Sequence, residues 1–130
     1  MHDLKLFILI SWISLPMVMF GGYSFLVFLR EKLSEEQKTF FRAGHAHAGV
    51  LLILSLVYYH YLGMTSFSAP TKYLACIILA LGIIMQSGGF FWHAFLDQNG
   101  KRTGIRITTM GAVSLATAVI MLVVGLADSL

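Results

Sequence analysis

Four long apolar stretches, separated by short charged segments, dominate the hydropathy pattern of this chain. None of the four contains Asp, Glu, Lys or Arg, and they cover residues 6–29, 43–71, 73–96 and 107–127. Each is longer than the roughly 20 residues that a helix needs to cross the hydrocarbon core of a bilayer. The stretches lack the alternation of barrel strands, so helices that satisfy their own backbone hydrogen bonds are expected.

Turn-forming residues shorten the second stretch, which is too long for one span. Gly63, Ser66, Ser68 and Pro70 lie in its last part, and this composition is typical of a loop. The first stretch is longer than a signal-peptide core and no small-residue cleavage site follows it, so we expect a retained helix. The prediction is an all-α, integral membrane four-helix bundle, a single transmembrane domain over residues 1–130, with helices at about 5–30, 44–62, 72–96 and 106–127.

Composition agrees with a membrane protein, and the charges predict its orientation. The chain is 58% hydrophobic and 12% charged, and its net charge of +3 is too small and scattered to indicate nucleic-acid binding. The loops after the first and third predicted helices carry seven positive residues: Arg30, Lys32, Lys38, Arg42, Lys101, Arg102 and Arg106. The other side has only Lys5 and Lys72. The positive-inside rule predicts a multi-pass protein of the cell inner (plasma) membrane with both termini outside.

Polar side chains inside the predicted spans are the candidate functional residues, because burying them in hydrocarbon is costly. They are His45, His47, His60, Gln86, Ser87 and His93. His47 and His93 each lie about one turn inside the same end of two antiparallel helices, so their imidazoles are expected at nearly the same depth. His60 lies about 20 Å further along its helix and is expected near the opposite surface.

Two imidazoles at one depth could hold a single metal between neighbouring helices. Without a thiolate, they suit heme iron first and copper second. We therefore expect heme b, with His47 and His93 as metal ligands and His45 as the alternative to His47. The histidines also have a structural interpretation, because Asp97 lies four residues after His93 and could simply hydrogen-bond to it.

Small residues surround the predicted cofactor site. Gly82, Gln86 and Gly89 share a helix face with His93, so Gln86 and Gly89 would adjoin a flat macrocycle. The same glycine strip is also typical of close packing against another helix. The positive partners expected for the heme propionates are Arg42, Arg102 and Arg106.

The spacing His-Ala-His adds a geometric constraint on the second predicted helix. It places the rings of His45 and His47 about 200° apart around the helix axis, so both cannot face the same core. One of them is expected to bind the metal, while the other faces solvent, lipid or a neighbouring subunit.

The start of the second predicted helix resembles a known pattern. Residues 44–51 read Gly-His-Ala-His-Ala-Gly-Val-Leu, and Tyr58 and Tyr59 follow. This resembles small four-helix membrane proteins related to the catalytic subunit of heme-copper oxidases, and the helix of nitric oxide reductases and C-type oxidases that supplies a histidine to the low-spin heme. The resemblance implies that His47 is a heme ligand in electron transfer or small-gas redox chemistry. The chain departs from that pattern at Gly49, where an asparagine is common.

A second resemblance keeps another class of function open. Residues 87–89, Ser-Gly-Gly, and residues 110–114, Met-Gly-Ala-Val-Ser, look like small four-helix membrane proteins and are similar to the hydroxylaminobenzene mutase group. That resemblance implies a cofactor-free isomerase with His45 or His47 as its acid–base residue. A third possibility is an accessory or structural subunit in which the histidines only form hydrogen bonds.

The sequence leaves open whether the chain is an enzyme, and we name no catalytic residue. The expected partners are the lipid bilayer, further copies of the same chain and redox partner proteins. A homo-oligomer is expected because four helices enclose little volume for a cofactor as large as heme.

Overall fold

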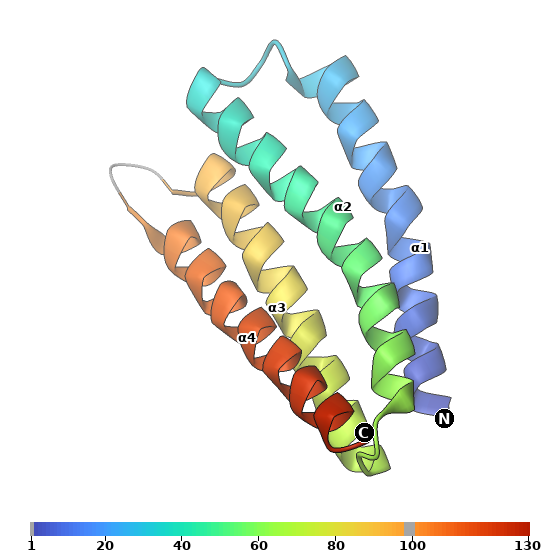
Figure 1. The fold of residues 1–130 in the computed structure, drawn as a ribbon. Coiled ribbons are helices and arrows are strands. Elements are labelled where there is room, and N and C mark those ends of the chain that lie inside the picture. The colour runs from blue at the N-terminus through green and yellow to red at the C-terminus, as the bar shows by residue number, and fades with distance from the viewer. Residues whose placement is uncertain (1, 98–100) are drawn as a thin grey trace.

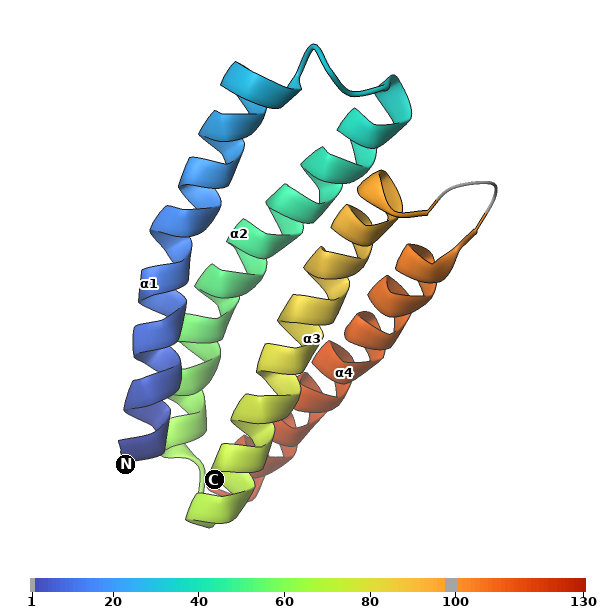
Figure 2. The ribbon, with the colours of Figure 1, turned by 180° about the vertical axis from the view of Figure 1, so that it is seen from behind.

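The chain forms four long helices joined by short loops (Figure 1). The computed structural model describes residues 2–97 and 101–130, and the side chains from Leu4 onward within these ranges. The helices are α1 (His2–Ser24), α2 (Glu35–Met64), α3 (Ala69–Phe95) and α4 (Thr103–Ala127), and one π-helical turn, η1 (Phe25–Leu29), continues α1. Successive helices run in opposite directions, so both termini and the α2–α3 loop lie at one end (Figures 1 and 2).

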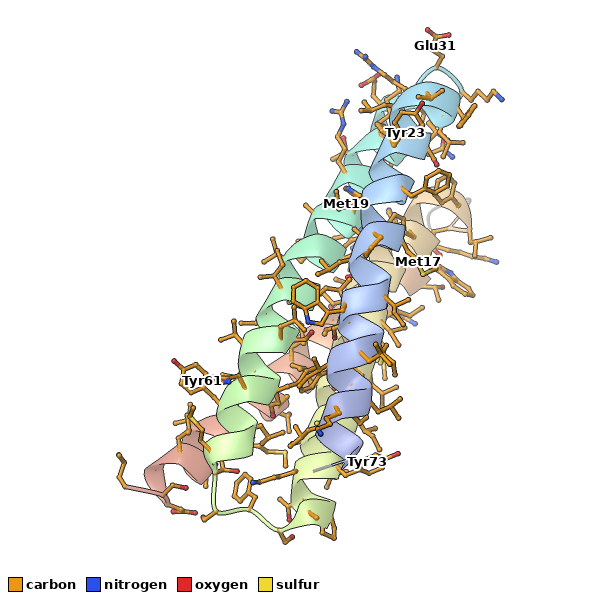
Figure 3. The ribbon with its side chains drawn as sticks, turned by 90° about the vertical axis from the view of Figure 1, so that its right-hand side faces the viewer. Met17, Met19, Tyr23, Glu31, Tyr61 and Tyr73 are labelled. Atoms are coloured by element: carbon orange, nitrogen blue, oxygen red, sulfur yellow. The ribbon has the colours of Figure 1, made fainter. Side chains whose placement is uncertain are left out.

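All four helices are long and apolar enough to cross a membrane. The prediction of an all-α protein of four helices is confirmed, and the four candidate spans agree with a multi-pass membrane protein. In the most apolar 18-residue window of the first candidate span, only 6% of the residues are buried inside the protein. Large apolar side chains such as Met17 and Met19 point outward (Figure 3), and 69% and 74% of their surfaces are exposed. A lipid environment explains such a surface, because soluble proteins rarely expose apolar patches of this extent to water.

The second helix begins at Glu35, well before the predicted residue 44, because its start is capped. The amide of Gln37 donates to Ser34 Oγ over 3.2 Å, and the amide of Ser34 donates to Gln37 Oε1 over 3.0 Å. This capping box satisfies two amides that a helix start otherwise leaves unpaired. The charged segment before the apolar run is therefore helical, and it extends α2 beyond the apolar part of the span.

Glycines allow α3 and α4 to pack closely side by side. A Cβ at Gly82 would lie 2.8 Å from Leu115 Cγ, and a Cβ at Gly89 would collide with Thr108 and with the Gly104 carbonyl. A Cβ at Gly111 would likewise collide with the backbone of Gln86. The glycine strip therefore serves helix packing, the use that small residues commonly have in membrane proteins.

The buried core lies toward the end of the bundle that carries the termini. Its largest members are Tyr58, Tyr59, Leu62, Leu79 and Ile83. The Tyr58 hydroxyl donates to the Ala118 carbonyl over 2.9 Å, and the hydroxyls of Ser11 and Ser55 are 2.8 Å apart. The candidate histidines lie toward the other end of the bundle, where the loop between α1 and α2 is found (Figures 1 and 2).

Candidate functional site at the histidine end

Four ring side chains alternate between α2 and α3, with the two predicted ligands at the ends of the series and two phenylalanines between them. The His93 ring lies 4.1 Å from the Phe40 ring, Phe40 lies 6.4 Å from Phe90, and Phe90 lies 4.9 Å from the His47 ring. The structure thus brings His47 and His93 to one helix interface. Among the described residues, no ring contact or hydrogen bond joins the two imidazoles directly. They are linked through Phe40 and Phe90, two residues that sequence reasoning missed.

The spacing of these phenylalanines contains a signal that could have revealed them. Phe40 lies seven residues before His47, and Phe90 lies three residues before His93. Residues three, four or seven apart share a helix face. The face that carries each histidine therefore also carries an aromatic neighbour.

His47 is oriented by its own helix. Its Nδ1 lies 2.8 Å from the Ala43 carbonyl oxygen, and since a carbonyl can only accept, Nδ1 carries the proton. Nε2 is then the nitrogen with the free lone pair. Histidines that bind metals commonly use this arrangement, in which one nitrogen donates to an oxygen and the other is available as a ligand.

His93 is oriented in the same way by a carboxylate. Its Nδ1 lies 2.9 Å from Asp97 Oδ2, as the spacing of the two residues predicted, and its Nε2 lies 3.9 Å from Glu36 Oε1. The same Asp97 oxygen accepts the Gly104 amide of α4 over 2.8 Å. His93 and Asp97 therefore tie together the start of α2, the end of α3 and the start of α4.

The environment of Asp97 favours its ionised form. Burial by itself would raise the pKa of the carboxyl, but hydrogen bonds from the Gly104 amide and from His93 outweigh it and lower the pKa below its ordinary value. Asp97 is therefore a carboxylate at neutral pH. It can accept from both donors at once, which holds the His93 ring in one orientation.

His45 faces the opposite side of α2. Its ring is nearly parallel to the Phe41 ring, with centroids 6.3 Å apart. It also packs against Gly22 of α1, where an added Cβ would lie only 2.7 Å from His45 Nε2. It lines an apolar crevice of about 400 Å³ together with Val18 and Phe91. The predicted divergence of His45 and His47 is thus confirmed: one faces α1 and the other faces α3.

The other predicted cofactor residues lie around the two interface histidines without meeting at one point. Gly89 is covered by α4, and Gln86 packs its backbone against Gly111. Gln86 Oε1 and Ser87 Oγ are buried and have no hydrogen-bond partner among the described residues. The exposed residues Arg42, Arg102 and Arg106 lie at this end of the chain.

Arg42 is directed toward the first helix. Its guanidinium carbon lies 5.9 Å from the centre of the Phe25 ring, which belongs to η1. A guanidinium over an aromatic face is held by a cation–π interaction. His60, in contrast, is exposed near the other end of α2, in agreement with its predicted position.

In the described parts of the chain, no group of three or more His, Cys, Asp or Glu residues could hold a metal ion. A metal bound by these residues of one chain would thus have at most two such ligands. Heme iron takes one or two axial ligands from a protein.

In a comparison with known proteins, no protein-family model, curated protein or solved structure matches this chain.

Proposed function

We propose that this chain is a heme-binding integral membrane protein that acts in electron transfer or small-gas redox chemistry. The proposal rests on one observation. His47 and His93 lie at one helix interface, and each donates Nδ1–H to an oxygen, at 2.8 Å and 2.9 Å. In the neutral imidazole this leaves the lone pair on Nε2, which is the chemistry that an axial heme ligand requires. His93 Nε2 lies 3.9 Å from Glu36 Oε1, so Glu36 would have to move aside for this nitrogen to bind iron. The resemblance of residues 44–51 to heme-copper oxidases points to the same His47.

The residues around these histidines fit the donor chemistry and polarity of heme b. Phe40 and Phe90 offer flat apolar faces at the α2–α3 interface. Gly89 forms no part of the proposed cradle, because α4 covers it. The two phenyl rings link the imidazoles, so a single iron bound by both histidines would have to displace them. When bound, the heme supplies one-electron redox chemistry, while Ala43 and Asp97 hold the two imidazoles in their orientations. Copper is the second choice of metal.

An absorbance spectrum tests this proposal. Protein purified in detergent from cells supplied with heme should show a Soret band, and His47→Ala and His93→Ala should each abolish or shift it. The matched control is His60→Ala, because His60 is exposed near the other end of α2, and it should leave the band unchanged. A colourless wild-type protein, or a band that survives both substitutions unaltered, would contradict heme binding. Metal analysis of a colourless sample would show whether copper is bound instead.

A cofactor-free isomerase is the second candidate, and the His93–Asp97 pair favours it. A carboxylate that orients a histidine is a common arrangement for general acid–base catalysis. We assign this role to His93 because it is the histidine paired with a carboxylate, whereas the resemblance to hydroxylaminobenzene mutases implied His45 or His47. Incubation of the membranes with hydroxylaminobenzene, followed by chromatography, should then reveal an isomeric product that His93→Gln abolishes. No isomer above the level of empty membranes would count against it.

We also propose that the chain forms homo-oligomers in the bilayer and exchanges electrons with a redox partner protein. Gly21 has open space beside it within the apolar helix α1, so another helix can approach closely there. Cross-linking in native membranes should yield a ladder of multiples of the 14.4 kDa chain. A single monomer band at all cross-linker concentrations would contradict the oligomer.

A further inference from the structure

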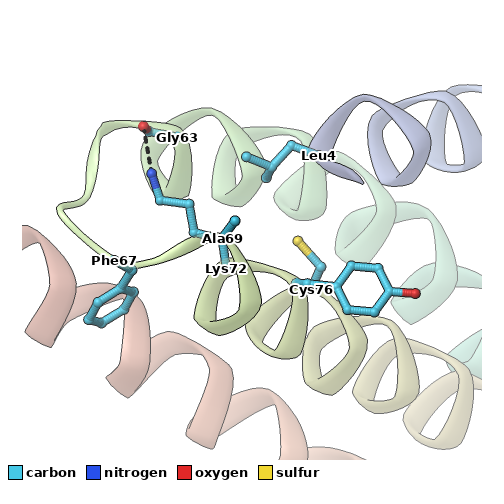
Figure 4. A pocket seen from close by; sticks show the side chains of 7 residues that line it. Leu4, Gly63, Phe67, Ala69, Lys72 and Cys76 are labelled. Atoms are coloured by element: carbon cyan, nitrogen blue, oxygen red, sulfur yellow. Dashed lines mark hydrogen bonds between the residues drawn. The ribbon is translucent and has the colours of Figure 1, made fainter. Parts of the chain in front are cut away.

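A second cavity lies at the opposite end of the bundle, remote from the histidines. It has a volume of about 170 Å³ and lies where the start of α1, the end of α2 and the start of α3 meet. Figure 4 shows the residues that line it: Leu4, Gly63, Phe67, Ala69, Lys72, Tyr73 and Cys76. Helix ends of a membrane-spanning bundle lie at the level of the lipid headgroups. The cavity is therefore accessible to headgroups and to small solutes from the aqueous phase.

Lys72 is the charged residue of this cavity. Its ammonium donates to the Gly63 carbonyl over 3.2 Å (Figure 4), which turns the half-buried side chain back toward the end of α2. An ammonium has three donors, and this bond uses one of them. Within the side chains that the structure describes, no carboxylate lies within ion-pair distance of Lys72. A partly buried cation that has no counter-charge among the described side chains is favourably placed to bind an anion.

The surroundings add to this preference. Leu4 and Phe67 give the cavity apolar walls, which raise the strength of a charge interaction by excluding water. The start of α3 lies beside it at Ala69, and the Ser68 side chain makes no cap to the α3 amides, because its hydroxyl pairs with Thr71 Oγ1 at 2.9 Å. The positive end of the helix dipole therefore lies on the same side as the ammonium.

We propose that this cavity binds a phosphate group, with the Lys72 ammonium as its charge partner. Its volume of 170 Å³ equals that of roughly five water molecules, which admits a phosphate and excludes a whole lipid. The phosphate can come from an anionic lipid headgroup or from a free anion. This site is independent of heme binding, and its test does not depend on the outcome at the histidine end.

Thermal unfolding in a neutral detergent tests the site. The probes are dihexanoyl phosphatidylglycerol, dihexanoyl phosphatidylcholine and inorganic phosphate, each titrated at constant ionic strength. Phosphatidylglycerol should raise the Tm of the wild type, and Lys72→Met should weaken its apparent affinity about tenfold, as expected for the loss of one charge-assisted hydrogen bond. Lys5→Met is the matched control, since Lys5 is an exposed cation at the same end, and it should behave like the wild type.

Two further variants keep the test decisive if Lys72→Met fails to fold. Lys72→Arg retains the charge and should keep the response, whereas Ala69→Leu narrows the cavity and should weaken it. An equal response to inorganic phosphate would identify a free-anion site, and a response to phosphatidylglycerol alone would identify a headgroup site. The proposal is overturned if neither phosphatidylglycerol nor inorganic phosphate raises Tm, if Lys72→Met leaves the response unchanged, or if Lys5→Met weakens the response as much as Lys72→Met.

Discussion

Each interface histidine is oriented by an oxygen that lies four residues away in the sequence. His47 uses the carbonyl of Ala43, and His93 uses the carboxylate of Asp97. Residues four apart lie on the same helix face, so local geometry decides which imidazole nitrogen donates. At the residue scale, contacts between residues close in sequence favour Nδ1 as the donor of both rings, and for His93 the Gly104 amide of α4 also holds the carboxylate in place.

Asp97→Asn should lower Tm at neutral pH and weaken the pH dependence of stability. The folded protein lowers the pKa of Asp97, so its contribution is fully present above the ordinary Asp value and is lost as the pH falls through the folded pKa. Melting curves of the wild type from pH 7 down to pH 3 should show this loss in the acidic range. Equal acid sensitivity in both proteins would show that Asp97 does not contribute.

Tyr58→Phe should destabilise the protein by about 1 kcal/mol, the usual net value of one hydrogen bond. The Tyr58 side chain is 2% exposed and its hydroxyl donates to Ala118 on α4 over 2.9 Å. Unfolding in mixed detergent micelles gives the free energy. Tyr61→Phe on the same helix is the control, because Tyr61 is 45% exposed, and a comparable loss there would argue against the Tyr58 bond.

At the scale of helices, α3 and α4 form a pair whose spacing is set by glycines. Gly89 and Gly104 bring the two backbones together near the histidine end, and Gly111 continues the contact along α4. Such close approach requires that no Cβ lie between the helices. The Gly104 amide that bonds to Asp97 is held in reach by this packing, so the helix pair positions the carboxylate that orients His93.

Gly89→Ala should destabilise the bundle by about 1–3 kcal/mol, because the added Cβ collides with the backbone of α4 and forces the helices apart. The adjacent Gly88 provides a matched control, since a Cβ there meets nothing within 4 Å. Gly88→Ala should be neutral or stabilising by up to about 1 kcal/mol, the difference in helix propensity. Equal effects of the two substitutions, measured by unfolding in micelles, would contradict the packing role of Gly89.

At the scale of the whole molecule, an apolar exterior and an uneven distribution of charge determine how the protein lies in a membrane. The exposed faces of all four helices carry large apolar side chains. Lys and Arg residues are concentrated at the end that carries the histidines. Lipid contact follows from the first feature, and the proposed orientation follows from the second.

Labelling of introduced cysteines from outside intact cells tests the orientation. Glu31→Cys, in the α1–α2 loop, should be protected from a membrane-impermeant maleimide, whereas Ser66→Cys, in the α2–α3 loop, should react. Both residues are exposed, and the native Cys76 is buried and should contribute little background. The reverse pattern would place the termini in the cytoplasm, and it would overturn the proposed topology while leaving the fold intact.

The number, type and order of the helices follow from the sequence by itself. Uninterrupted apolar runs of this length have one favourable solution in lipid, a helix with its own hydrogen bonds satisfied. The start of α2 at Glu35 could also have been predicted, because Ser34 and Gln37 have the spacing of a capping box. The bond between His93 and Asp97 could be predicted for a similar reason, since Asp97 follows His93 by four residues and lies just past the end of α3.

The neighbour of each helix face was decided only by the tertiary structure. Hydropathy shows that Gly89 lies on an apolar helix, but the same small surface suits a macrocycle or a second helix, and the structure shows α4 packed against it. The phenyl rings between His47 and His93 and the cavity at Lys72 likewise depend on how helices are rotated and paired. Side-chain packing in three dimensions sets these rotations, whereas hydropathy reports only that a face avoids water.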